Sequence, residues 1–238
     1  AKINVFRSTG RGLMYPVAEK VVHSPQTAGR VTVDIPMTGL MDGGYFWFDV
    51  ESLDGEVIIS EAAWSVPQSD RTASKPTTMS IAITTFNRAS YCMNQLRAIA
   101  GAKELRKRLD TVYCTDQGND LVKNQQGYTQ IAEDLGAQLT YIQQANLGGS
   151  GGFSRGMYET LKAKKSDFVL LLDDDAISEP ESILRSIQFS DYTVRPLLVG
   201  GGMFHSTIEP CCTHKVNESM RGECGCIPRR VWGTTMIF

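Results

Sequence analysis

The sequence lacks any long apolar run and any strong excess of charge. No stretch approaches the roughly 20 consecutive apolar residues that span a bilayer, and the segment Ala1 to Gly10 has no apolar core of a signal peptide. The 238 residues carry 24 Lys and Arg against 26 Asp and Glu, a formal net charge of -2. This balance gives no electrostatic reason to expect nucleic acid as a partner. We therefore expect a cytoplasmic globular protein whose partners are set by local sites.

Two common nucleotide-binding signatures are also missing. The segment 146–156 fails the P-loop pattern because Met157 stands where the lysine should be, and it has no GxGxxG spacing. Its glycines, at positions 148, 149, 151, 152 and 156, supply bare backbone ahead of a predicted helix, which suits close approach to phosphate or sugar. A flexible turn is the alternative interpretation of the same glycines.

Paired cysteine knuckles of the kind that bind zinc are absent as well. Of the six cysteines, Cys211, Cys212, Cys224 and Cys226 gather near the end of the sequence with His214, but their spacing does not give paired CxxC motifs. A cytoplasmic chain normally keeps its thiols reduced. We expect plain reduced cysteines, with a disulfide or a zinc site as the alternative.

Short strands separated by turn residues predict a small β-sandwich domain over residues 1–75. Alternating or apolar runs at 30–35, 45–50 and 57–60 predict strands, as does 3–6, and Asp54-Gly55 predicts a hairpin. The large rings of Trp47 and Trp64 are suited to the centre of such a sandwich. A sheet that binds sugar through exposed aromatic rings is the alternative use for them.

From residue 76 to residue 238 the rhythm changes to strands alternating with helices, which predicts a second, α/β domain. Residues 67–78, rich in Ser, Thr, Pro and charge, predict a linker before it. We expect strands at 79–85, 111–115, 138–143, 168–172 and 197–199, and helices at 90–100, 127–135, 154–165 and from residue 180. Ser154 is the expected cap of its helix, and Pro180 the expected first residue of the last one. A series of this kind favours a parallel sheet.

Polar or glycine-rich residues follow the four clearest of these strands. They are Phe86-Asn87-Arg88, Asp116-Gln117-Gly118, Asn146-Leu147-Gly148-Gly149 and Asp173-Asp174-Asp175. Ligands of parallel α/β sheets bind beyond the carboxyl ends of the strands. The sequence therefore predicts a binding site at this edge of the sheet.

The three successive aspartates predict a metal site, because adjacent carboxylates repel one another unless a cation sits among them. Asp173 and Asp175 project to the same side of an extended segment and can offer hard oxygen ligands to Mg²⁺ or Mn²⁺, while substrate phosphates complete the shell. Asp174 then points elsewhere, toward a ribose or sugar hydroxyl. The alternative, an acidic cap for the next helix, explains one aspartate better than three. Arg88 and Arg155 are candidate partners for diphosphate charge, although isolated arginines are commonly solvated.

Together these features resemble the GT-A fold of family 2 glycosyltransferases, whose first loop holds the nucleotide and whose DxD motif holds the metal. The strings that carry a closer resemblance are Thr84 to Arg88, Asp116 to Gly118, Asn146 to Arg155, Asp173 to Asp175 and Val199 to Gly201. In that order, behind a β-rich domain with a strand like Tyr45 to Asp49, they look like the polymerising galactofuranosyltransferases of actinobacterial cell-wall galactan. The similarity covers about Val31 to Gly202.

This resemblance implies a site for a nucleotide-sugar in a Rossmann-like domain. The expected contacts to the nucleotide-sugar are Thr85, Phe86, Arg88, Gln117, Asn146, Gly148, Gly149, Arg155 and Asp174, with Asp173 and Asp175 as metal ligands. The implied reaction is inverting, metal-dependent transfer of galactofuranose from UDP-galactofuranose to a lipid-linked galactan hydroxyl. Inversion needs a carboxylate general base near the acceptor.

The sequence departs from the family pattern after Met203, where no base motif is recognisable. The available carboxylates there are Glu209, Glu218 and Glu223, and none is assigned a role, nor are His205 and His214. The chain reads as a partial member of the family. Two other functions stay open: a family 2 transferase for another nucleotide-sugar, such as a rhamnosyl or glucosyl donor, and a non-catalytic glycan-binding protein. Attachment to the inner face of the plasma membrane and formation of a homo-oligomer also stay open.

Overall fold

The computed structural model describes residues 1–23, 29–37, 44–195, 198–201 and 234–237. Among these, residues up to Ser65 form one compact unit, and residues from Val66 onward form a second. The second unit thus takes in the segment 67–78 that the sequence marks as a linker. The predicted domain limits, 1–75 and 76–238, stay a prediction.

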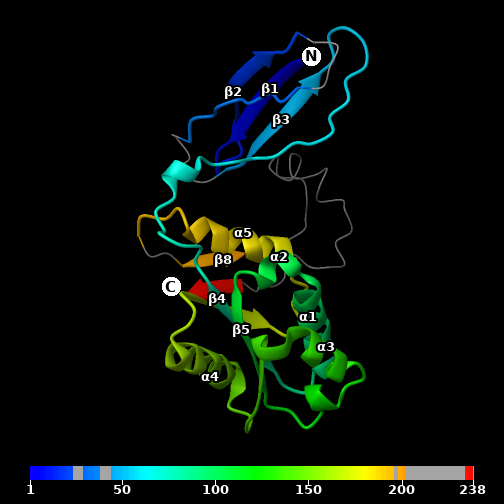
Figure 1. Ribbon diagram of the computed structural model, residues 1–238, viewed down its shortest axis with the longest axis vertical. Coiled ribbons are helices and arrows are strands. Elements are labelled where there is room, and N and C mark those ends of the chain that lie inside the picture. Colours follow the sequence, from blue (N-terminus) through cyan, green and yellow to red (C-terminus); the bar gives the residue numbers. More distant parts are fainter. Residues whose placement is uncertain (24–28, 38–43, 196–197, 202–233, 238) are drawn as a thin grey trace. The chain divides into compact units, whose positions relative to one another are not determined.

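The first unit contains a three-stranded antiparallel sheet in the order β2-β1-β3 (Figure 1). Its strands are β1 (Lys2–Ser8), β2 (Met14–Val21) and β3 (Phe46–Glu51). Strands β1 and β3 lie where the sequence predicts them. Strand β2 was not predicted, because Pro16 and its charged neighbours weaken the apolar alternation. Pro16 is tolerated because β2 lies at the edge of the sheet.

Two strands and one hairpin predicted in this unit are wrong. Residues 30–35 and 57–60 form no strand, and no hairpin forms at Asp54-Gly55. An Asp-Gly turn makes a hairpin only when the flanking segments pair. Here β3 pairs with β1 instead, and the segment after Gly55 has no strand partner. The described residues of this unit form no second sheet, which a sandwich requires.

The two tryptophans differ in their surroundings. Trp47 is half-buried and stacks on Phe6, with 5.6 Å between ring centroids. Trp64 is 56% exposed and lies against Phe46 and Phe48 at 6.2 and 5.8 Å. The expectation of a buried central Trp64 is therefore wrong, because the segment that carries it adds no strand to the sheet.

The second unit is built on a six-stranded sheet, which confirms the predicted α/β class. The strands, in the spatial order β6-β5-β4-β7-β9-β8, are β4 (Met79–Thr85), β5 (Leu109–Asp116), β6 (Leu139–Gln143), β7 (Phe168–Asp173), β8 (Val199–Gly201) and β9 (Thr234–Ile237). Strands β4 to β7 pair in parallel, and β9 pairs antiparallel with both β7 and β8. Continuous apolar runs between turn residues made β4 to β7 predictable to within about two residues.

Helices cover both faces of this sheet (Figure 1). They are α1 (Ala89–Gly101), α2 (Lys103–Arg106), α3 (Tyr128–Leu135), α4 (Gly148–Ala163) and α5 (Pro180–Ser190), with short 3₁₀ turns η1 (Gln68–Asp70), η2 (Val122–Asn124) and η3 (Gly136–Gln138). Helices α1 and α3 lie on one face and α4 on the other, as right-handed crossovers require. The core between them includes Ile81, Ile83, Leu96 and Leu170. None of the described helices is both long and apolar enough to cross a bilayer.

Helix α4 begins at Gly148, so the expected cap at Ser154 is wrong. The reason is packing between the helix and the sheet. A Cβ on Gly152 would lie 2.2 Å from the Thr84 side chain, and a Cβ on Gly156 would lie 2.3 Å from the Cβ of Ala82. These glycines let the helix backbone approach β4 closely, and this tertiary contact overrides the low helix propensity of glycine.

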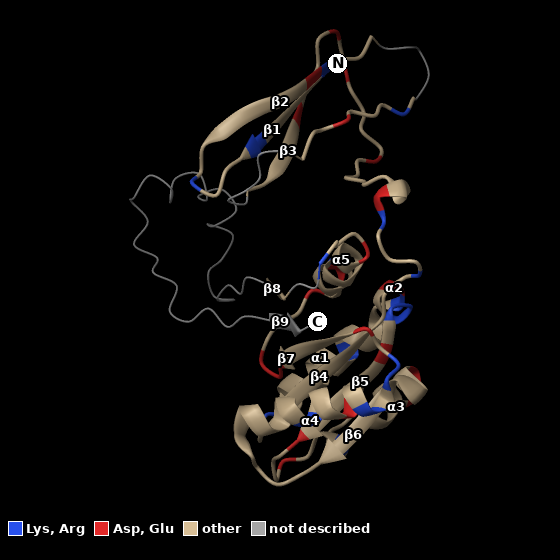
Figure 2. Ribbon diagram, turned by 90° about the vertical axis from the view of Figure 1, so that its left-hand side faces the viewer, with Lys and Arg blue, Asp and Glu red and all other residues tan. Residues whose placement is uncertain are grey.

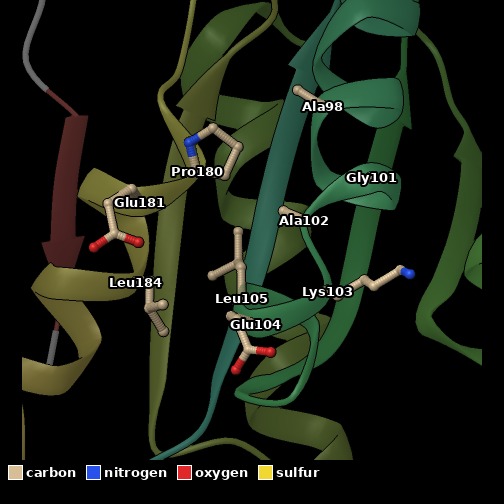
Figure 3. Close-up of a pocket in the computed structure, with 9 residues that line it drawn as sticks. All are labelled: Ala98, Gly101, Ala102, Lys103, Glu104, Leu105, Pro180, Glu181 and Leu184. Carbon is tan, nitrogen blue, oxygen red and sulfur yellow. The ribbon is translucent and has the colours of Figure 1, made fainter. Parts of the chain in front are cut away.

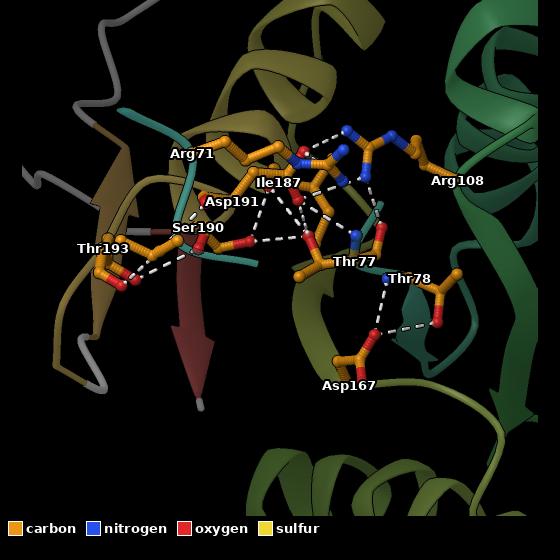
Figure 4. Close-up of polar contacts among 10 residues, drawn as sticks. Arg71, Thr77, Thr78, Arg108, Asp167, Ile187, Ser190, Asp191 and Thr193 are labelled. Carbon is orange, nitrogen blue, oxygen red and sulfur yellow. Dashed lines mark hydrogen bonds and ion pairs between the residues drawn. The ribbon is translucent and has the colours of Figure 1, made fainter. Parts of the chain in front are cut away.

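The segment 67–78 is fixed to the second unit by a buried polar network around Asp191 (Figure 4). Asp191 is 4% exposed, and its carboxylate accepts hydrogen bonds from Arg108 Nη2 at 2.5 Å and from the Thr77 backbone N–H at 3.0 Å. Arg71 Nη2 lies 3.5 Å from the same carboxylate. These bonds hold the pKa of Asp191 below its usual value, against the opposing effect of burial. The predicted linker is thus a docked segment.

Candidate functional site

The carboxyl ends of β4 and β7 meet at the point where the strand order reverses. From β4 the chain moves to β5 and β6 on one side, and then crosses to β7 on the other. Thr84 is in register with Asp173, and Thr85 with Asp116. Ligands of open α/β sheets bind at such a switch point. The structure therefore brings the loops after β4, β5 and β7 to one place, as the sequence predicts.

Across this switch point Arg88 forms an ion pair with Asp175. Both side chains are about half exposed, at 54% and 45%. Burial and then the neighbouring charges of Asp175 and Asp174 raise the pKa of Asp173. The aspartates therefore repel one another as expected, and a guanidinium is the cation that stands beside them in this structure.

Asp174 differs from its neighbours because it is buried, with 8% of its surface exposed. Burial raises its pKa, while the nearby Thr85 hydroxyl and the charge of Arg88 lower it. The Thr85 hydroxyl lies close to this carboxylate without making a hydrogen bond of good geometry. Contact of Asp174 with a ribose or sugar hydroxyl stays a prediction, and in this structure the carboxylate faces the protein interior.

Asp173 and Asp175 fit a divalent metal of the Mg²⁺ or Mn²⁺ type. Mg²⁺ is commonly bound through one or two carboxylates and substrate phosphates, so two hard oxygen donors at an exposed strand end are sufficient. Within the described ranges, no three His, Cys, Asp or Glu side chains converge into a complete metal site. The carboxylates Glu209, Glu218 and Glu223, the histidines His205 and His214, and the four clustered cysteines lie outside the described residues.

The second and third loops are joined by Gln117, which is 5% exposed. Its Nε2 donates to the carbonyl oxygen of Gly148 at 3.0 Å, and its Oε1 accepts from the Leu147 N–H at 2.9 Å. Asn146 Oδ1 accepts from the Gly148 N–H at 2.9 Å. Both predicted nucleotide contacts therefore also shape the start of α4, where Gly148 and Gly149 are exposed.

Asp116 is a residue whose role the sequence did not predict. It is fully buried, and its carboxylate accepts from the Gly118 N–H at 3.0 Å, the Val122 N–H at 2.8 Å and the Tyr141 hydroxyl at 2.8 Å. Burial and then the bond to Asp116 raise the pKa of Tyr141. The three hydrogen bonds of the Asp116 carboxylate thus hold the loop after β5 in shape. The sequence marks Asp116 as part of the polar cluster at the end of a strand, but it does not show that the side chain turns back to the loop.

The remaining predicted contacts are spread unevenly around this edge. Thr85 is buried at 2%, while Phe86 is 48% exposed beside it. Arg155 lies inside α4 instead of at its beginning, and its Nε donates to Glu159 at 2.9 Å. Binding of a diphosphate by Arg155 would therefore compete with an ion pair that the helix already holds.

A separate hollow of about 470 Å³ lies between the end of α1, α2 and the start of α5 (Figure 3). Its walls are mainly apolar, with Ala98, Leu105 and Leu184, and Lys103 and Glu181 stand at the rim. None of the predicted nucleotide or metal contacts lines it. Basic and acidic positions are interspersed along the described chain (Figure 2), so charge alone marks neither this hollow nor the switch point.

Each of the two units matches a model of a known protein family. A model of the family described as glycosyltransferase like family 2 matches residues 76–200, and one described as galactofuranosyltransferase 2 N-terminal matches residues 1–67. Two relatives named galactofuranosyltransferase GlfT2 are similar: that of Mycolicibacterium smegmatis is 34% identical over 219 residues, and that of Mycobacterium tuberculosis 32% over 220. The alignments cover 92% and 91% of this chain, which spans 33% of the length of each relative.

Solved structures of nucleotide-sugar transferases are more distant. Glucosyl-3-phosphoglycerate synthase from Mycobacterium tuberculosis, solved with Mn²⁺, UDP and glucosyl-3-phosphoglycerate, is 16% identical with a TM-score of 0.42, over 74% of this chain and 63% of that one. A mannosyltransferase from Pyrobaculum calidifontis, solved with GDP-mannose and Mn²⁺, is 15% identical with a TM-score of 0.39, over 61% and 40%.

Proposed function

Because the chain belongs to the glycosyltransferase-like family 2, we propose that it binds UDP-galactofuranose with a divalent metal and transfers the sugar, with inversion, to a galactan hydroxyl. The observation that carries this proposal is the pairing of Arg88 with Asp175 at the switch point of the sheet. It supports the proposal because a guanidinium that can meet a diphosphate then lies beside carboxylates that can hold a metal. The sugar class rests on the similarity to the two galactofuranosyltransferases.

In this proposal Asp173 and Asp175 hold the metal, and Arg88 turns from Asp175 to the diphosphate. A guanidinium suits this exchange because it forms paired hydrogen bonds with carboxylate and phosphate alike. Bound Mg²⁺ or Mn²⁺ stabilises the negative charge of the departing UDP. In this proposal the Arg88 guanidinium and the metal ion held by the aspartates together balance the negative charge of the diphosphate.

The start of α4 provides the neutral part of the site. The first N–H groups of a helix have no partner within the helix and point toward an anion. The exposed Gly149 offers such backbone, while Asn146 Oδ1 accepts from the Gly148 N–H and Gln117 Nε2 donates to the Gly148 carbonyl oxygen, which holds the start of the helix in place. The exposed ring of Phe86 is available to a base on the other side of the switch point.

The proposal is tested by calorimetric titration of the chain with UDP, with Mn²⁺ present or with a chelator. We expect affinity to fall at least about tenfold in the chelator, because the metal neutralises the repulsion between carboxylates and diphosphate. The double variant Asp173→Asn, Asp175→Asn should bind UDP equally weakly in both conditions. Asp134→Asn, an exposed carboxylate of α3, is the matched control and should behave as the unmodified chain.

Equal affinity for UDP in chelator and in Mn²⁺ would remove the metal from the proposal. The preferred donor is identified by comparing the affinities of the chain for UDP-galactofuranose, UDP-glucose and dTDP-rhamnose. Preference for either of the last two would replace the galactofuranosyl assignment with another family 2 activity.

A further inference from the structure

Asn87, between β4 and α1, has a left-handed backbone conformation, with φ of 53°. Few residues with a side chain adopt this conformation readily, and Asn is one of them because its short amide can bond locally. The amide oxygen Oδ1 accepts from the Asn119 N–H at 2.7 Å and from the Asp120 N–H at 3.1 Å. A single side chain thus caps two backbone donors of the second loop.

The first two loops are also in backbone contact. A Cβ on Gly118 would lie 2.6 Å from the backbone nitrogen of Asn87, which no change of side-chain rotamer can relieve. The Gln117 N–H donates to the carbonyl oxygen of Thr85 at 3.0 Å. The loop after β4 is therefore fixed against the loop after β5 by three backbone donors and one close contact.

Arg88 follows Asn87 directly and is the N-cap residue of α1. Its carbonyl oxygen accepts from the Tyr91 N–H at 3.0 Å, so its backbone is committed to the helix while its side chain reaches Asp175. The left-handed turn at Asn87 sets the direction in which the chain leaves buried Thr85 and enters the helix. The position of the Arg88 guanidinium thus depends on the two hydrogen bonds that Asn87 accepts from the loop after β5.

We infer that Asn87 is a positioning residue, whose bonds to Asn119 and Asp120 hold Arg88 in reach of Asp175 and of the diphosphate. Its action on nucleotide binding rests on the proposed function. Asn87 does not itself touch the nucleotide in this scheme. It acts through Arg88, and the two residues should therefore be thermodynamically coupled.

The first test needs no nucleotide. Asn87→Gly keeps the left-handed backbone and removes the acceptor, whereas Asn87→Asp keeps an acceptor. We expect amide hydrogen exchange at Asn119 and Asp120 to be slow in the unmodified chain and in Asn87→Asp, and faster in Asn87→Gly. The NMR resonance of the Arg88 guanidinium should shift in Asn87→Gly. Lys164→Gly, at the other left-handed non-glycine position, is the matched control and should leave both signals unchanged.

The second test measures UDP affinity in Mn²⁺. Loss of two hydrogen bonds should weaken UDP about tenfold in Asn87→Gly, and no further loss should appear when Asn87→Gly is added to Arg88→Ala. Equal losses in the presence and absence of Arg88, or unchanged exchange at Asn119 and Asp120, would overturn the inference. An unmodified chain that does not bind UDP overturns the proposed function instead, and the NMR and exchange results then decide the positioning of Arg88 by themselves.

Discussion

At the scale of single residues, we propose Arg88 as the principal cation for a diphosphate, because it stands beside Asp175 at the switch point of the sheet. We expect Arg88→Ala to weaken UDP by roughly 1.5 to 3 kcal/mol, the loss that accompanies a hydrogen bond to a charged group. The matched control is Arg97→Ala on the same helix, because Arg97 donates to Asn94 on the exposed surface. Titration of both folded variants with UDP measures the difference, and equal affinities would return Arg88 to an ordinary surface role.

The charged residues that follow a strand could be predicted from the sequence, whereas the residues whose side chains hold the loops in shape could not. Asp173, Asp175 and Arg88 follow apolar runs, so their place at the carboxyl edge of the sheet can be predicted from the sequence, while their roles stay a prediction. The roles of Asp116 and Asn87 depend on backbone donors that reach them only in the folded loops. A left-handed turn at a non-glycine residue leaves no clear mark in a single sequence.

At the scale of elements, the close contact between α4 and β4 gives a sharp prediction. Gly156→Ala should destabilise the chain by about 1 to 3 kcal/mol, because its Cβ would overlap that of Ala82. Gly149→Ala is the matched control: among the described residues, no atom lies within 4 Å of the place its Cβ would take. It should be neutral or stabilising by up to about 1 kcal/mol. Urea denaturation followed by circular dichroism measures both, and equal stability of the two variants would contradict the packing described for α4.

The order of the elements could be predicted from the sequence, whereas the start of α4 could not, because it depends on the contact with β4. Family membership and the parallel strands agree with the predicted GT-A class, since alternating strands and helices specify that order directly. The glycines that begin α4 look like a loop by propensity. They are helical because Gly152 and Gly156 face the sheet, a relation that a propensity scale does not contain.

At the scale of the α/β unit, the network around Asp191 predicts a dependence of stability on pH. The folded pKa of Asp191 is lowered, so the stability that it contributes is present above the unfolded value of about 3.9 and is lost as pH falls through the folded value. Asp191→Asn should lower the free energy of unfolding at pH 7 by roughly 3 to 5 kcal/mol, because it leaves Arg108 buried without its charge partner.

The measurement is urea unfolding of the unmodified chain and of Asp191→Asn at pH 7 and near pH 3. The difference between the two proteins should be smaller at the lower pH, because Asp191 is then largely protonated in the unfolded chain and the stability that its lowered folded pKa contributes decreases. Asp134→Asn on the exposed face of α3 serves as the control and should follow the unmodified chain at both values. A difference that stays constant with pH would mean that the charge of Asp191 does not stabilise the fold.

The place of β9 in the sheet has a consequence for synthesis on the ribosome. Strand β9 pairs with both β7 and β8, although residues 234–237 are made after both of them. Until then, the edge of the apolar strand β7 that faces β9 lacks the strand that pairs with it among the described residues. At about 5 to 20 residues per second, the nascent chain carries this open edge for roughly 3 to 13 s. An unpaired apolar strand edge is the kind of surface that aggregates. During this interval the open edge of β7 can pair with strands of other chains, so we expect aggregation to be favoured before residues 234–237 are made.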